Sequence, residues 1–119
     1  MIRNKIVLDE YTKGQLQLAR RTYGHKNQIL VSIEELNELA CVLAKYPRYD
    51  EENKATEELY SKVLDEVADV IIVLDHVINI VGLKDDDIDL RIQLKIGRLA
   101  RWLRHSSSMQ ETIDDRTVK

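Results

Sequence analysis

Few residues in this 119-residue chain break or cross-link the backbone: it has one cysteine, one proline and four glycines. The lone Cys41 has no second cysteine to pair with, which excludes an internal disulfide. A chain without disulfides fits the reducing cytoplasm, and we expect the protein there. Sparse glycine and proline indicate few turns and long secondary-structure elements.

The chain also lacks a long uninterrupted apolar run. Its most apolar stretch is broken by Asp69, Asp75, His76 and Asn79, whereas a membrane-spanning helix needs about 20 apolar residues in succession. The residues that follow Met1 contain no long apolar segment and no small-residue cleavage site, so we expect no signal peptide. The net charge of −3 argues against a general nucleic-acid binder.

Apolar residues recur at helical spacing, which predicts an all-α, four-helix, bundle-like fold. With 44% hydrophobic and 33% charged residues, the composition is that of a folded domain, and the length suits one domain. We expect this domain over residues 1–105 and a polar, mobile tail over 106–119. The predicted helices are Asp9–Tyr23, Lys26–Tyr46, Ala55–Val81 and Asp85–Arg104, with a polar loop over Arg48–Lys54.

Several residues predict where the helices begin and end. Asp9 is a candidate N-cap of the first helix, and Gly24 ends it. Pro47 is expected to end the second helix, because proline cannot continue a helix and disfavours the helical conformation at Tyr46. The expected core face of that second helix is an apolar stripe of Ile29, Ile33, Leu36, Ala40 and Leu43.

The third predicted helix is apolar on all sides, since eleven of the fifteen residues from Val67 to Val81 are apolar. A helix of this kind is normally buried all round. Three other helices of one small chain rarely enclose a fourth so fully, so we expect a homo-oligomer with this helix near the interface. The alternative is a tight monomeric bundle.

Acidic residues gather at two places in the second and third helices. Glu34, Glu35 and Glu38 lie on the second, and Glu66 and Asp69 lie on the third, so that each helix presents a pair of carboxylates three residues apart. Converging carboxylates at an apolar surface need a compensating charge. Oxygen ligands favour Mg²⁺, with Mn²⁺ as an alternative. Solvated helix faces would give the same spacing, although the apolar run around Asp69 weighs against this.

The pattern Glu34-Glu35-Leu36-Asn37-Glu38, followed after 27 residues by Glu66-Val67-Ala68-Asp69-Val70, resembles a known signature. It is similar to the EExxE…ExxD motif of the MazG-like all-α nucleoside triphosphate pyrophosphohydrolases, in particular the short single-domain versions of bacteria and phages. The resemblance covers roughly residues 23–102.

This resemblance implies an enzyme that cleaves NTPs or dNTPs between the α and β phosphates, giving the monophosphate and pyrophosphate. It implies a dimer or tetramer that uses Mg²⁺ and controls the nucleotide pool or removes unwanted nucleotides. Glu35, Glu38, Glu66 and Asp69 would bind the metal. Glu34 would be a further ligand or would orient the attacking water, so the catalytic set is Glu34, Glu35 and Glu38.

Four further residues are candidates for substrate contact. Lys95 and Arg98 of the fourth helix would neutralise charge on the phosphates, or would form a solvated basic face. Gln28 precedes Glu35 by two turns and by resemblance would reach the substrate. Asn79 and His76 continue a polar stripe from Glu66 and Asp69, and could touch the nucleotide or form hydrogen bonds between subunits.

Two other functions remain open from the sequence. The chain could be a non-catalytic helical module that binds a partner, with the acids serving only as surface charge. It could also be an enzyme of the same fold that is specific for dUTP or another phosphate substrate.

Overall fold

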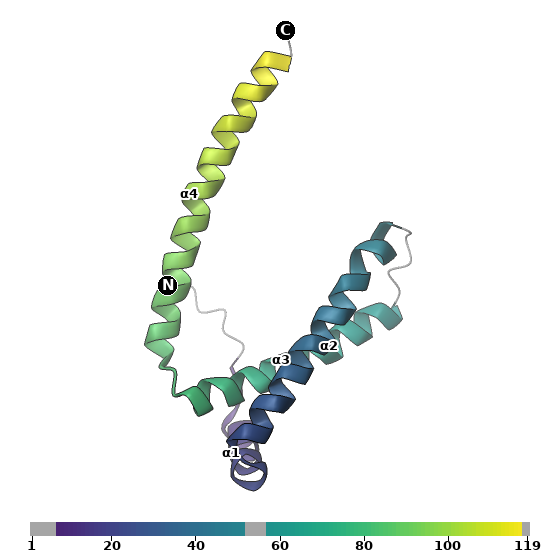
Figure 1. Ribbon diagram of the computed structural model, residues 1–119, viewed down its shortest axis with the longest axis vertical. Coiled ribbons are helices and arrows are strands. Elements are labelled where there is room, and N and C mark those ends of the chain that lie inside the picture. The colour runs from purple at the N-terminus through teal and green to yellow at the C-terminus, as the bar shows by residue number, and fades with distance from the viewer. Residues whose placement is uncertain (1–6, 52–56, 118–119) are drawn as a thin grey trace. The chain divides into compact units, whose positions relative to one another are not determined.

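The structure, a computed structural model, describes residues 7–51 and 57–117, with side chains for 7–48 and 57–107. Its elements are α1 (Glu10–Tyr23), α2 (His25–Glu51), α3 (Glu57–Val81) and α4 (Asp85–Thr117), shown in Figure 1. The described residues form helices and no strand, which confirms the all-α prediction for this part of the chain. None of these helices is both long enough and apolar enough to span a membrane.

The chain divides into two compact units, Met1–Gly82 with α1 to α3 and Leu83–Lys119 with α4. Within the first unit, α2 and α3 lie side by side and form the main packing contact, and α1 packs against both (Figure 1). The expectation of one domain over residues 1–105 stays a prediction.

Local signals set both ends of α1, as expected. Asp9 is its N-cap: the carboxylate Oδ1 accepts a hydrogen bond from the backbone N–H of Thr12 at 2.7 Å. Hydrogen bonding with the Thr12 side chain, followed by this backbone bond, lowers the pKa of Asp9. At the other end Gly24 has a φ of 87°, and its N–H donates to the carbonyl of Arg20 at 2.9 Å. The next helix begins directly at His25, so this single glycine makes the corner between α1 and α2.

The face of α2 that packs on α3 differs from the expected one. Gln28, Ser32 and Val42 are buried, and they follow a seam of alternating four- and three-residue steps with Glu35 and Leu39. Ser32 is almost fully buried, and its hydroxyl donates to the carbonyl of Gln28 at 2.7 Å.

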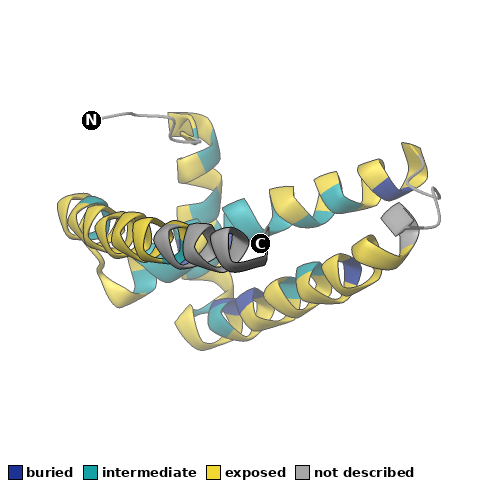
Figure 2. Ribbon diagram, turned by 90° about the horizontal axis from the view of Figure 1, so that it is seen from above, coloured by how far each residue is buried: buried dark blue, intermediate teal, exposed yellow. Residues whose placement is uncertain are grey.

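The apolar stripe expected in the core therefore lies beside the α2–α3 contact and not within it. Ile33, Leu36 and Leu43 are 42–49% exposed. The expectation is wrong here because the most hydrophobic side of α2 is not the side that packs on α3. Figure 2 shows few buried residues along the helices.

The predicted end of α2 is also wrong. The helix continues through Pro47 to Glu51, so the expected loop from Arg48 is helical as far as Glu51. Proline removes only the N–H that would bond the carbonyl of Leu43, and a single further turn follows it. The rest of that expected loop and the predicted start of the third helix at Ala55 lie outside the described residues.

The fourth helix is longer than expected. It was predicted to end at Arg104 and instead continues through Ser106 to Thr117. No glycine or proline follows Gly97, so the sequence contains no residue that would stop the helix earlier. The mobility expected for residues 106–119 stays a prediction.

Candidate metal centre

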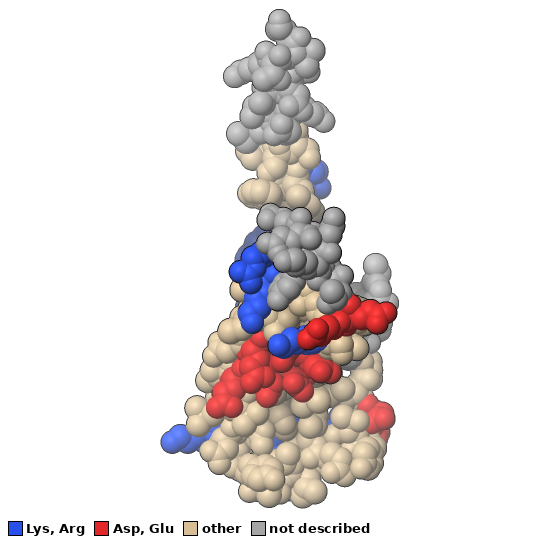
Figure 3. All heavy atoms as spheres, turned by 90° about the vertical axis from the view of Figure 1, so that its right-hand side faces the viewer, with Lys and Arg blue, Asp and Glu red and all other residues tan. Residues whose placement is uncertain are grey.

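Four carboxylates converge between α2 and α3. Glu35 and Glu38 of α2 and Glu66 and Asp69 of α3 each offer one carboxylate oxygen, and these four oxygens all lie within 4.8 Å of one another. Glu35, Glu66 and Asp69 are half-buried, whereas Glu38 is exposed. The four carboxylates thus lie partly buried between α2 and α3, and the cluster is open to solvent at Glu38. Figure 3 shows acidic side chains gathered on one face of the molecule.

Helix geometry brings these four residues together. Glu35 lies on the α2 seam that faces α3, between Ser32 and Leu39, and Glu38 follows it by three residues on the same side. Glu66 and Asp69 repeat this spacing on α3. Because the two helices pack along these faces, their two pairs of carboxylates meet.

The surroundings of the cluster disfavour ionisation. Burial raises the pKa of Glu35 to about 7, with a further contribution from the negative charges of Glu38 and Asp69. Burial, followed by the charges of Glu38 and Asp69, raises the pKa of Glu66 as well. The cluster without a cation is therefore electrostatically unfavourable near neutral pH.

A hard divalent cation fits this donor set. Oε2 of Glu35 and Oε2 of Glu66 are buried and have no hydrogen-bond partner among the described residues. Buried carboxylate oxygens normally have a partner, and these four residues could hold a metal ion that would supply one. The donors are all oxygens, which is the ligand type that Mg²⁺ prefers.

Glu34 does not join this group. Its side chain is exposed on α2, one residue before Glu35 and therefore rotated away from the seam. The role of water orientation implied for Glu34 stays a prediction. Gln28 is buried at the α2–α3 contact, two turns before Glu35 on the same face.

Asn79 lies away from the carboxylates, near the end of α3. It follows Asp69 by ten residues, or about 15 Å along the helix. Its amide donates to the carbonyl of Asp75 at 2.8 Å. It lines a polar pocket with residues of α1 and the start of α2, and not the metal centre.

Lys95 and Arg98 are exposed on α4, which belongs to the second unit. They follow one another by three residues and so share a face of that helix. Their expected contact with the phosphates stays a prediction.

An ion pair between α1 and α3 was missed by the sequence analysis. Arg20 Nη1 donates to Asp75 Oδ2 at 3.2 Å and lies 3.0 Å from Nδ1 of His76. His76, which sequence alone left as a candidate for hydrogen bonds between subunits, thus has a partner within one chain, as does Asp75. Buried or half-buried polar side chains such as Asp75 and His76 need hydrogen-bond partners, and this need could have been recognised from the sequence. The sequence does not indicate which of its arginines is the partner.

No family model matches the chain, and neither a curated protein nor a solved structure is similar enough to count as a match.

Proposed function

We propose that this protein is a Mg²⁺-dependent nucleoside triphosphate pyrophosphohydrolase with a MazG-type helical fold. The observation that carries the proposal is the group of four carboxylates, with its two buried oxygens that lack partners. The motif resemblance supplies the reaction, which is cleavage of a (d)NTP between the α and β phosphates.

Glu35, Glu38, Glu66 and Asp69 would hold the metal. Held there, Mg²⁺ would supply positive charge to the phosphates and would lower the pKa of a bound water molecule. The half-buried carboxylates of Glu35, Glu66 and Asp69 keep the donor oxygens fixed by the packing of α2 on α3. The exposed side at Glu38 leaves room for a substrate to approach.

Other residues of the chain would complete the site. An acidic centre repels a triphosphate unless cations balance it, and Lys95 and Arg98 are the residues proposed to supply charge to the leaving pyrophosphate. Gln28, which lies on the same face of α2 as Glu35, is a further residue proposed to contact the nucleotide. The nucleotide contact expected of Asn79 stays a prediction, since Asn79 lines a different pocket.

We also propose that the protein acts as a homo-oligomer, a dimer or tetramer. In the described chain the apolar stripe of α2 is exposed, with Ile33 49% and Leu43 48% accessible. An apolar stripe of this length on a helix is typical of a face that becomes covered.

The test of the function is a substrate panel. The eight standard NTPs and dNTPs and dUTP are incubated with the protein, with Mg²⁺ or with EDTA, and monophosphate and pyrophosphate are quantified. We expect Mg²⁺-dependent formation of both products in equal amounts. Diphosphate and orthophosphate as products would contradict α–β cleavage, and activity on dUTP alone would favour the specific pyrophosphatase.

The competing function, a non-catalytic partner-binding module, makes the opposite prediction. It requires that no nucleotide be cleaved and that Mg²⁺ leave the melting temperature unchanged, whereas a cation that binds only the folded state must raise it.

A further inference from the structure

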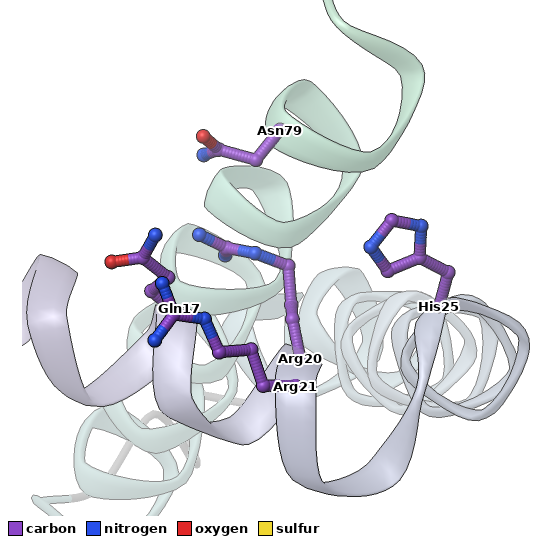
Figure 4. A pocket seen from close by; sticks show the side chains of 5 residues that line it. All are labelled: Gln17, Arg20, Arg21, His25 and Asn79. Atoms are coloured by element: carbon purple, nitrogen blue, oxygen red, sulfur yellow. The ribbon is translucent and has the colours of Figure 1, made fainter.

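A second polar site lies in the first unit, where α1 meets the start of α2 and the end of α3. It is a pocket of about 280 Å³ lined by Gln17, Arg20, Arg21, His25 and Asn79 (Figure 4). The lining contains two guanidinium groups and no carboxylate. In Figure 4 the guanidinium groups of Arg20 and Arg21 are directed toward the same side of the pocket as the amide of Gln17.

The side chain of Arg20 is fixed by two residues of α3. Its side chain is only 10% exposed, and its two contacts, to Asp75 and His76, both use Nη1. A guanidinium has five N–H donors and no acceptor, so Nδ1 of His76 accepts and the imidazole proton lies on Nε2. Burial, followed by the charge of Arg20, lowers the pKa of His76, which agrees with a neutral ring. The remaining N–H groups of Arg20 are available to a ligand.

Among the other lining residues, only the amide of Asn79 makes a side-chain hydrogen bond within the described chain, to the carbonyl of Asp75. Neither Arg21 nor His25 makes an ion pair or side-chain hydrogen bond there, and the same holds for Gln17. Asp75 balances one of the two arginines, so the pocket has a net positive charge. Such a set of unpaired N–H donors around a fixed guanidinium suits an oxyanion.

We propose that this pocket is an oxyanion site that binds a phosphate group without a metal. The forked donors of Arg20 and Arg21 would contact the phosphate oxygens, and Gln17 and His25 would add further N–H groups. The volume lies near the lower end of the range of small-ligand pockets, about 300–1,000 Å³, which suits phosphate or pyrophosphate better than a whole nucleotide.

This site is separate from the carboxylate cluster in place and in chemistry. Asn79 and Asp69 are about 15 Å apart along α3, and the pocket supplies N–H donors where the cluster supplies carboxylates. The inference therefore does not depend on the proposed enzymatic activity.

The test is an NMR titration of the full chain with inorganic phosphate, pyrophosphate or a nucleoside monophosphate, in EDTA. The three ligands distinguish the free anion from the phosphate group of a nucleotide. We expect saturable shifts confined to backbone amides around Arg20, His25 and Asn79. Arg21→Gln removes a forked donor that supports no other contact, and we expect it to weaken binding about tenfold.

Lys62→Gln is the matched control, because it removes one positive charge from an exposed position at the far part of α3. It should leave binding unchanged, and so should Glu38→Gln. The proposal is overturned if wild-type protein shows no saturable shifts at these amides, if Arg21→Gln has no effect, or if Lys62→Gln weakens binding equally. Loss of the proposed hydrolase activity alone would leave the result of this titration unaffected.

Discussion

Glu35 combines partial burial with the like charges of nearby carboxylates. Its pKa of about 7 in the folded chain lies above the ordinary value of 4.5. Between these two pH values the folded state binds more protons than the unfolded state. The stabilising contribution of protonated Glu35 is therefore complete below about pH 4.5 and is lost as the pH rises through about 7.

This linkage predicts the pH dependence of the metal-free protein. In EDTA, the melting temperature of the wild type should fall between pH 4.5 and 7, and Glu35→Gln should reduce this fall because glutamine cannot ionise. Thermal melts across this pH range measure it. Glu58→Gln, at an exposed position of α3, should follow the wild type. Identical pH profiles for Glu35→Gln and the wild type would contradict the assigned cause.

Two ion pairs of α1 differ in burial and should differ in energy. The Arg20–Asp75 pair has side chains 10% and 18% exposed, with 3.2 Å between its atoms. Removing Arg20 leaves Asp75 and His76 without their donor, so Arg20→Gln should lower the free energy of unfolding by about 1–3 kcal/mol. Chemical denaturation measures this, and a double-mutant cycle with Asp75→Asn should show coupling.

The control is the Lys13–Glu10 pair on the same helix. Its atoms are 3.9 Å apart and its side chains are 47% and 95% exposed. Lys13→Gln should therefore leave stability unchanged within error. Equal effects of the two substitutions would show that the α1–α3 pair is as weak as a surface pair.

At the scale of elements, the corner at Gly24 fixes how α1 meets α2. Its φ of 87° and ψ of 159° fall in a region that side chains other than glycine rarely adopt, and no atom lies within 4 Å of an added Cβ. The cost of Gly24→Ala is thus a backbone cost, about 1–3 kcal/mol of lost stability. Denaturant unfolding tests it.

Gly14→Ala provides the opposite case within α1. Gly14 is inside the helix, and nothing lies within 4 Å of an added Cβ, so alanine should stabilise the protein by about 0.5–1 kcal/mol. If both substitutions changed stability in the same direction, the conformation assigned to Gly24 would be wrong.

The ends of α1 and the end of α3 could be predicted because they depend on single residues. Asp9, Gly24 and Gly82 act locally, through a capping hydrogen bond or a positive φ. The packing face of α2 could not be predicted from the sequence, because it depends on the side from which α3 approaches. Local preference also failed at Pro47, where one missing hydrogen bond does not end the helix.

In the candidate site, too, local features could be predicted and features that depend on helix packing could not. The i, i+3 spacing predicted that Glu35 pairs with Glu38 and Glu66 with Asp69, and the structure brings the two pairs together. The distance between the carboxylate pair of α2 and that of α3 depends on how the two helices pack, so residue spacing in the sequence could not predict it. The pocket around Arg20 was missed because it depends on the approach of α3, whose Asn79 is distant in sequence from the lining residues of α1 and α2.

At the scale of the whole molecule, the exposed stripe of α2 predicts self-association. Leu36 is 42% exposed within this stripe. Leu36→Glu should dissociate the oligomer, because a charge placed in an apolar contact loses its hydration. Its neighbour Asn37 is exposed on another side of α2, so Asn37→Glu is the control and should leave the oligomer intact. Sedimentation analysis measures both, and a monomeric wild type would refute the prediction.

The central claim is that the four carboxylates carry out metal-dependent release of pyrophosphate. The most direct test compares wild type, Glu38→Gln and Glu58→Gln for pyrophosphate release from the best nucleotide, with Mg²⁺ at saturation. Glu38→Gln removes one ligand charge at nearly constant shape and should reduce the rate at least about 100-fold, whereas Glu58→Gln should retain the wild-type rate. Equal rates for Glu38→Gln and the wild type, or no pyrophosphate from any nucleotide, would contradict the claim.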